Sequence, residues 1–281
     1  MTHPADTVKT RMQLQGEAVR QGGTARYAST ADCFVQCSRI EGIRGLQRGL
    51  PTAIVREFTL NCVRVGLFEP VLGTLHDPKA GSPPMHKRFA AGILTGCCGA
   101  LVTNPLDLLK TRMQAQASGD NATVGHQHGY AGVVDGVTRM LREEGVVGMY
   151  KGASASMVRL ALGSAAQLST YSAIKEWMLA HSGARDGPLL HVGVSFASVV
   201  FGVTAMQPSD VVRTRLYNQP FDSAGRGKLY AGPVDAAAKI MRLEGTRALF
   251  KGWGAHYLRG APHVALLFLS LEQLKKHRPL G

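Results

Sequence analysis

PLDLLKTR, at residues 105–112, is one of three versions of a single eight-residue pattern in this chain. PADTVKTR occupies residues 4–11 and PSDVVRTR occupies residues 208–215, so the copies begin 101 and 103 residues apart. A second pattern repeats with the same period: EGIRGLQRG from Glu41, EGVVGMYKG from Glu144 and EGTRALFKG from Glu244. Two motifs that each occur three times in a fixed order indicate three tandem copies of one unit of about a hundred residues.

The composition is unusual for a soluble α/β enzyme and fits an anionic partner. The 281 residues are 45% hydrophobic and 18% charged, include 33 glycines and carry a net charge of +13. Such a charge suits nucleic acid, acidic lipid or a small anion. The bases are spread through apolar segments and helix ends, whereas a nucleic-acid binder needs a basic face with stacking aromatic side chains, so we expect no nucleic-acid partner.

We find no sequence pattern typical of an enzyme, a metal centre or a cofactor site. The five cysteines are an odd number without metal-ligand spacing. His126 and His128 lie in the polar stretch GHQHGY without a third ligand in a plausible pattern. No nucleophile with its base, glycine-rich phosphate loop or pair of carboxylates is evident. We therefore expect no enzymatic activity, no metal and no cofactor.

Each unit contains two apolar stretches of about the length that a membrane helix needs, which is roughly 20 residues. Between them lie a polar loop and a short amphipathic segment. The sequence therefore predicts three helical hairpins and ideally six membrane helices. The stretches are Leu50–Leu75, Phe89–Leu109, Ala153–Ile174, Pro188–Val212 and Gly254–Leu271.

The sixth stretch, at the start of the first unit, is incomplete. Phe89 precedes Pro105 by 16 residues, whereas three residues precede Pro4. Most of the first membrane helix is therefore expected to be missing, because so short a segment could not satisfy its backbone hydrogen bonds in lipid. We expect that Met1 is not the true start, and no targeting segment can be identified.

The triplicated P-x-[DE]-x-x-[KR]-x-[KR] and [DE]-G-x(4)-aromatic-[KR]-G motifs resemble those of the mitochondrial carrier family, solute carrier family 25, over essentially the whole chain. The stretches NCVRVGLFEP from Asn61, RLYNQP from Arg215 and RGAPHVALLFLSLEQLKK from Arg259 resemble its oxaloacetate and dicarboxylate branch. The resemblance implies an all-α membrane protein in which each repeat has two transmembrane helices and a short matrix helix. It also implies a pseudo-threefold bundle of six helices with repeats at residues 1–82, 83–185 and 186–281.

Proline inside a helix removes a hydrogen bond and kinks the axis, so kinks are expected at Pro4, Pro105 and Pro208. The acid two residues later and the base five residues later lie near one another at a helix end. By the family pattern these charges form a gate on the matrix side of the membrane. Its expected pairs are Asp6 with Lys110, Asp107 with Arg213, and Asp210 with Lys9.

The even-numbered helices carry a weaker version of a second gate. The family pattern is aromatic-acid-x-x-base, and its aligned charges here are Glu69, Lys175, Glu272 and Lys275. Of these, only Glu69 and Lys175 can pair as the pattern requires. The sequence therefore predicts a loose gate on the cytoplasmic side and a resting preference for the state open to that side.

Three arginines are the expected substrate ligands. Arg56, Arg159 and Arg259 each stand thirteen residues before the gate position of their helix. That spacing puts each about 20 Å from the gate, near the middle of the membrane. A charge at that depth is costly and therefore indicates a function. Arginine keeps its charge and offers a planar fork that matches a carboxylate.

Further residues are weaker candidates for contacts with substrate. The resemblance places Leu160 beside Arg159 in the site, and Arg64 can share the cavity face with Arg56. For Arg64 the alternative is an interhelical ion pair or a base that reaches the membrane surface. For the polar side chains, interhelical hydrogen bonds are the commoner role. These polar candidates are Asn61, Gln167 and His263.

The expected function is that of an antiporter of the mitochondrial inner membrane. It would exchange small dicarboxylates or oxoacids such as oxaloacetate, malate or malonate, and also sulfate, by alternating access at one central site. The alternatives are an uncoupling-protein-like carrier that conducts protons with fatty acids, and a structural membrane protein, which would not explain the three arginines. A monomer in contact with inner-membrane lipids such as cardiolipin is expected.

Overall fold

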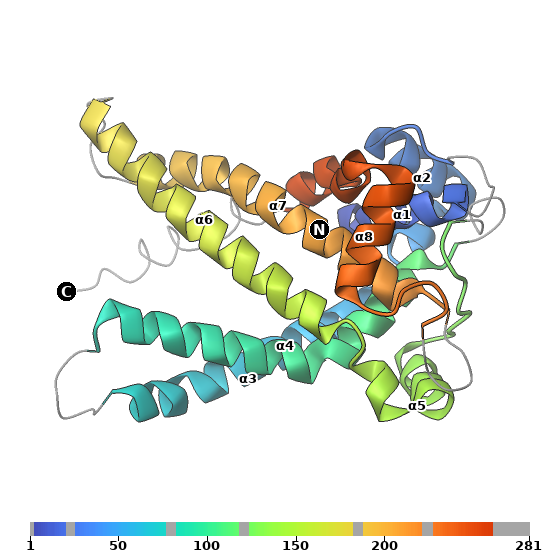
Figure 1. Cartoon of the computed structure of the whole chain (residues 1–281), viewed down its shortest axis with the longest axis horizontal. Helices are drawn as coiled ribbons and strands as arrows, with labels where there is room; N and C mark the ends of the chain where they lie inside the picture. The colour runs from blue at the N-terminus through green and yellow to red at the C-terminus, as the bar shows by residue number, and fades with distance from the viewer. Residues whose placement is uncertain are drawn as a thin grey trace.

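The computed structural model describes residues 3–20, 26–76, 83–117, 124–181, 188–220 and 227–260, and the statements below concern these residues. They form helices and connections, without a β-strand in the described ranges (Figure 1). The helices are α1 (His3–Arg20), α2 (Thr30–Leu46), α3 (Leu50–Leu75), α4 (Met85–Ala115), α5 (Val133–Met149), α6 (Ala153–His181), α7 (Pro188–Asn218) and α8 (Pro233–Glu244). A 3₁₀ turn, η3 (Thr246–Phe250), follows α8, and residues 253–260 are again helical. The predicted all-helical fold is confirmed.

The second unit contributes a long helix, a short helix and a second long helix, in the order α4, α5 and α6. In the first unit the order is α1, α2 and the long α3, and in the third it is the long α7, the short α8 and the helical residues 253–260. The long helices pack in pairs, α3 along α4 and α6 along α7. The two pairs converge at the end where α2, α5 and α8 lie and diverge toward the other end (Figure 1). At Gly99 of α4 a Cβ atom would lie 2.8 Å from Cδ1 of Leu60 on α3, so the missing side chain permits the close approach of the two helices.

The glycine of each EG motif has a backbone conformation that other residues rarely adopt. Gly42, Gly145 and Gly245 have φ values of 66°, 68° and 82°. In α2 and α5 this glycine sits at a kink, and in the third unit it separates α8 from η3. The repeated glycine is thus explained by the turn that it allows between the acid and the following helical segment.

The short helices bury a small apolar core in each unit. Tyr27, Tyr130 and Tyr230 occupy corresponding places in these three cores and are 2%, 5% and 1% exposed. The amphipathic segments predicted from sequence supply their apolar faces, for example Met140 of α5 and Ile240 of α8, which are both buried. These cores hold the three units together at the end where the long helices converge.

The long helices expose apolar side chains elsewhere. Ile54, Phe58 and Val65 of α3 are 61%, 72% and 75% exposed, which is typical of a surface that contacts lipid. By length and composition together, residues 87–115 are the one candidate membrane span within the described residues. α3 has 26 residues but carries Arg56, Glu57 and Arg64 along its middle. Pro105 and Pro208 lie inside α4 and α7, whereas Pro4 is the second residue of α1.

Candidate functional site

Three ion pairs that are buried or partly buried form a closed ring between α1, α4 and α7. Lys110 Nζ lies 2.9 Å from Asp6 Oδ2, and Arg213 Nη2 lies 2.9 Å from Asp107 Oδ2. Lys9 and Asp210 complete the ring, with side chains 9% and 3% exposed. These are the pairs that the family pattern implies. We call the three aspartates and their three bases the aspartate ring.

Each aspartate of the ring also binds one of the three expected substrate ligands. Arg56 Nε lies 3.0 Å from Asp107 Oδ1. Arg159 Nε lies 2.7 Å from Asp210 Oδ1. Arg259 Nε lies 3.0 Å from Asp6 Oδ1.

The two carboxylate oxygens of each aspartate divide their ion pairs in the same way. In all three, Oδ2 faces the base of the ring and Oδ1 faces Nε of the arginine. At Asp107, Nη2 of Arg56 also donates to Oδ2, at 3.4 Å. The sequence predicted the ring and the arginines as separate layers and did not predict that they share the same carboxylates. A movement of any of these arginines therefore changes the contacts of an aspartate in the ring.

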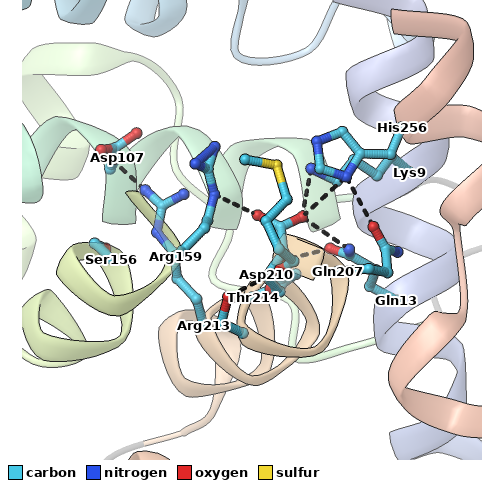
Figure 2. A network of polar contacts seen from close by, with 12 residues as sticks. Lys9, Gln13, Asp107, Ser156, Arg159, Gln207, Asp210, Arg213, Thr214 and His256 are labelled. Carbon is cyan, nitrogen blue, oxygen red and sulfur yellow. Dashed lines mark hydrogen bonds and ion pairs between the residues drawn. The ribbon is translucent and has the colours of Figure 1, made fainter. Parts of the chain in front are cut away.

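Asp210 lies in a network of further polar side chains, which Figure 2 shows. Gln13 Nε2 donates a hydrogen bond of 3.0 Å to Asp210 Oδ2, and Thr214 Oγ1 donates one of 2.7 Å to Gln13 Oε1. His256 is 2% exposed, and its Nδ1 lies 3.9 Å from Asp210 Oδ2. Its Nδ1 is also 2.8 Å from Gln207 Oε1. Asp210 is therefore held in place by neutral polar side chains in addition to its two ion pairs.

A second layer of ion pairs joins the last base of each proline motif to the acid of the EG motif. Arg11 pairs with Glu41, Arg112 with Glu144 and Arg215 with Glu244. Their Nη2–Oε2 distances are 3.0, 2.9 and 2.9 Å, and each guanidinium is also bonded through Nη1. Such two-point pairs fix each long helix to its own short helix.

The pairing of the second layer was missed in the sequence. All six residues belong to the triplicated motifs, so the common period was the signal that could have found them. Burial raises the pKa of Glu244, but the Arg215 guanidinium lowers it further, and the net pKa of this carboxyl is below its usual range. Glu244 is therefore ionised at neutral pH.

The remaining predicted residues are not part of this cluster. The Arg64 side chain is exposed, and its Cγ lies 3.3 Å from the Cβ position of Gly99. Asn61 Nδ2 donates to the backbone oxygen of Glu57 at 2.8 Å, a bond within α3. Leu160 Cδ2 lies 3.4 Å from the Cβ position of Gly96, so this side chain packs toward α4.

The cytoplasmic-side charges are only partly described. Glu69 is exposed on α3, and no ion pair joins it to Lys175 of α6 within the described part of the chain. The side chain of Gln167, and the whole of His263, Glu272 and Lys275, lie outside the described residues. The structure therefore brings together the aspartate ring and the three arginines, and leaves the second gate a prediction.

The histidines of GHQHGY lie beside a second-layer arginine. His128 stacks on Tyr130, and burial together with the nearby Arg112 lowers the pKa of His128 to about 2. Within the described ranges, no group of three histidine, cysteine or acidic side chains could hold a metal ion.

Comparison with known proteins agrees with this arrangement. The family described as mitochondrial carrier protein matches residues 1–79, 81–182 and 185–279. The mitochondrial oxaloacetate transport protein of Schizosaccharomyces pombe is 39% identical, over 98% of this chain and 85% of its own length. Solute carrier family 25 member 35 of Mus musculus is 37% identical, over 98% and 92%. The mitochondrial citrate transporter E of Aspergillus niger is 36% identical, over 98% and 88%.

The family matches three consecutive segments that span the chain, in agreement with the three units found from the repeated motifs. Its members are transporters and not enzymes. Relatives at this level of identity include proteins named for oxaloacetate and for citrate, so identity alone does not fix the substrate. On the motifs, the helical architecture and the match along the whole chain, this protein belongs to the mitochondrial carrier family.

Proposed function

We propose that this carrier exchanges small dicarboxylate or oxoacid anions across the mitochondrial inner membrane, which it spans several times. Oxaloacetate, malate, malonate and sulfate are the candidate substrates. The observation that carries the proposal is the cluster of three arginines, because guanidinium groups bind carboxylates through two parallel hydrogen bonds. The similarity to an oxaloacetate transport protein supports the same substrate class.

Two of the three arginines have terminal guanidinium nitrogens without an ion pair among the described residues, which favours a substrate with two carboxylates. Arg56 uses all three nitrogens, because Nε and Nη2 contact Asp107 and Nη1 contacts Glu57. Arg159 and Arg259 each have one ion pair within the described residues, made through Nε. The terminal nitrogens of these two side chains are therefore the ones we expect to bind the two carboxylates of a substrate.

Substrate binding would also weaken the aspartate ring. A carboxylate bound by Arg159 competes with Asp210, and one bound by Arg259 competes with Asp6. A ligand can shift a conformational equilibrium only through its different affinities for the two states. Here the difference arises because the arginine can be satisfied by the substrate in place of the ring, so that the ring separates more easily. The empty carrier would keep the ring closed and change state slowly.

The conformation described here would be the state open to the cytoplasm. The aspartate ring is formed at the end where the helix pairs converge, and the pairs diverge at the opposite end (Figure 1). This agrees with the resting preference expected from the weak second gate. In this reading the ring is the matrix gate, and alternating access proceeds by opening it once the substrate is bound.

In this proposal the carrier works as a monomer and binds lipids such as cardiolipin at its matrix-side helix ends. Gly132 and Gly232 are the N-cap residues of α5 and α8, and a glycine offers no side-chain oxygen to the first N–H groups of the helix. Free N–H groups at a helix N-terminus suit an anionic headgroup. Both helix ends are therefore reasonable sites for phosphate groups of a lipid.

The experiment compares Arg159→Lys and Arg259→Lys in proteoliposomes loaded with malonate, with uptake of labelled malonate or oxaloacetate as the readout. Lysine keeps the charge but lacks the fork, so both variants should lose most of the exchange. Arg139→Lys is the control, since Arg139 forms an exposed pair with Glu143 on α5. Full exchange in both variants would refute the central-arginine site. Fatty-acid-dependent proton leak that exceeds anion exchange would instead support an uncoupling carrier.

A further inference from the structure

Glu57 pairs with the guanidinium group of Arg56, the third arginine of the site. Its Oε1 lies 2.5 Å from Nη1 of Arg56, the neighbouring residue of α3, and its side chain is 54% exposed. The Glu57 carboxylate also interacts electrostatically with Arg259. A carboxylate of the protein thus sits where a third carboxylate of a substrate would be expected.

Glu57 changes the net charge of the group formed by the aspartate ring and the three arginines. The aspartate ring and the three arginines together contain six basic and three acidic side chains. Glu57 is the fourth acid, which leaves an excess of two positive charges. Arg64 is not joined to these groups by any ion pair in the described part of the chain. A dianion balances the excess of two, whereas a trianion would balance the excess of three that exists without Glu57.

We propose that Glu57 determines the charge class of the substrate, so that the carrier accepts dianions and discriminates against trianions. It does so in two ways: it fills the fork of Arg56, and it repels a third negative charge. This inference rests on the proposed function, because it assumes that the arginines bind the transported anion. Residue 57 is then a specificity-determining position, although it lies outside the repeated patterns.

The repulsion is large enough to measure. Two unit charges several ångströms apart near a protein surface interact by an amount that corresponds to roughly a tenfold change in an equilibrium constant or more. Because Glu57 is half exposed, solvent screens part of this interaction, and we expect a change of about tenfold in selectivity. A larger factor would follow if the freed Arg56 also bound the third carboxylate.

The test measures exchange of malate and of citrate in the same proteoliposomes, at a pH where both are fully ionised. Glu57→Gln and Glu57→Ser should each raise the citrate-to-malate rate ratio about tenfold. Glu57→Asp keeps the charge and should stay close to the wild-type ratio. Glu143→Gln, an exposed acid on α5, is the control. The ratio is internal to each preparation, so it does not depend on how much of a variant is incorporated.

The outcomes separate this inference from the proposed function. A wild-type protein that exchanges malate, together with an unchanged ratio in both neutral variants, would overturn the role of Glu57 alone. A ratio that rises equally in Glu57→Asp would also overturn it, because the effect would then come from side-chain shape. A wild-type protein that exchanges none of malate, malonate, oxaloacetate and sulfate in the same vesicles would overturn the proposed function itself.

Discussion

Replacing Asp210 by asparagine removes the most heavily bonded charge of the aspartate ring. The Asp210 side chain is 3% exposed and binds Lys9 and Arg159, and it accepts a hydrogen bond from Gln13. Asparagine keeps the size but leaves two buried cations without their common counter-ion. Removing one partner of a buried ion pair costs about 3–5 kcal/mol. For a chain of this size that corresponds to a fall of roughly 10 °C in the midpoint of thermal unfolding.

The assay is thermal unfolding of the purified carrier in detergent at neutral pH. Asp6→Asn should have a smaller effect, because its partner Arg259 is 34% exposed and no side-chain amide bonds to Asp6 in the described residues. Glu143→Gln is the control for loss of an acid, since its pair with Arg139 is exposed and should contribute little. An unfolding midpoint for Asp210→Asn as high as that of the control would refute the reasoning that the ring stabilises this state.

Three further predictions concern the short helices. Glu244→Gln should destabilise the fold at neutral pH and remove part of the loss of stability that acid causes. The folded-state pKa of Glu244 is lowered, so the stabilisation by its carboxylate is present above the unfolded-state pKa and is lost as the pH falls through the folded-state pKa. Unfolding midpoints measured over a series of pH values check this prediction. The pKa of His128 is lowered to about 2 in the folded state, so between that value and its unfolded pKa the unfolded chain binds one proton more than the folded chain. The free energy of unfolding should therefore fall on acidification from pH 7 to 5, by at most about 1.4 kcal/mol per pH unit. His128→Gln should flatten this slope, and the control His181→Gln, at an exposed histidine, should not. Gly245→Ala, at φ 82°, should destabilise by about 1–3 kcal/mol, whereas Gly73→Ala, inside α3 with open space around it, should be neutral or stabilising in the same denaturation assay.

The helical architecture and the partners of the ring could be predicted because they repeat. One acid and one base at fixed positions in each copy, such as Asp107 and Lys110, allow a ring of three pairs between three equivalent helices, and the family pattern implied which acid pairs with which base. The same repetition carries the pairs of the second layer, but the motif does not say which of its bases turns inward to the aspartates and which turns to the short helix. That choice depends on helix rotation, which the packed structure supplies.

The contact between the arginines and the ring could not be predicted from spacing. Arg56 and Asp107 are 51 residues apart, on helices whose relative depth is set by packing at small residues such as Gly99. Spacing along α3 places Arg56 relative to its own helix end, not relative to α4. The polar partners of Asp210 were also missed, because Gln13 and His256 belong to neither repeated motif.

The measurement that tests the central claim most directly is uptake of labelled malonate by proteoliposomes that contain the wild-type carrier, with and without malonate inside. Exchange at a central site that needs an anion to open the ring predicts rapid uptake into loaded vesicles and very slow uptake into empty ones, and the same pattern with oxaloacetate. Equal uptake into loaded and empty vesicles would contradict the coupling between substrate and ring. No uptake of any small dianion would contradict the substrate class.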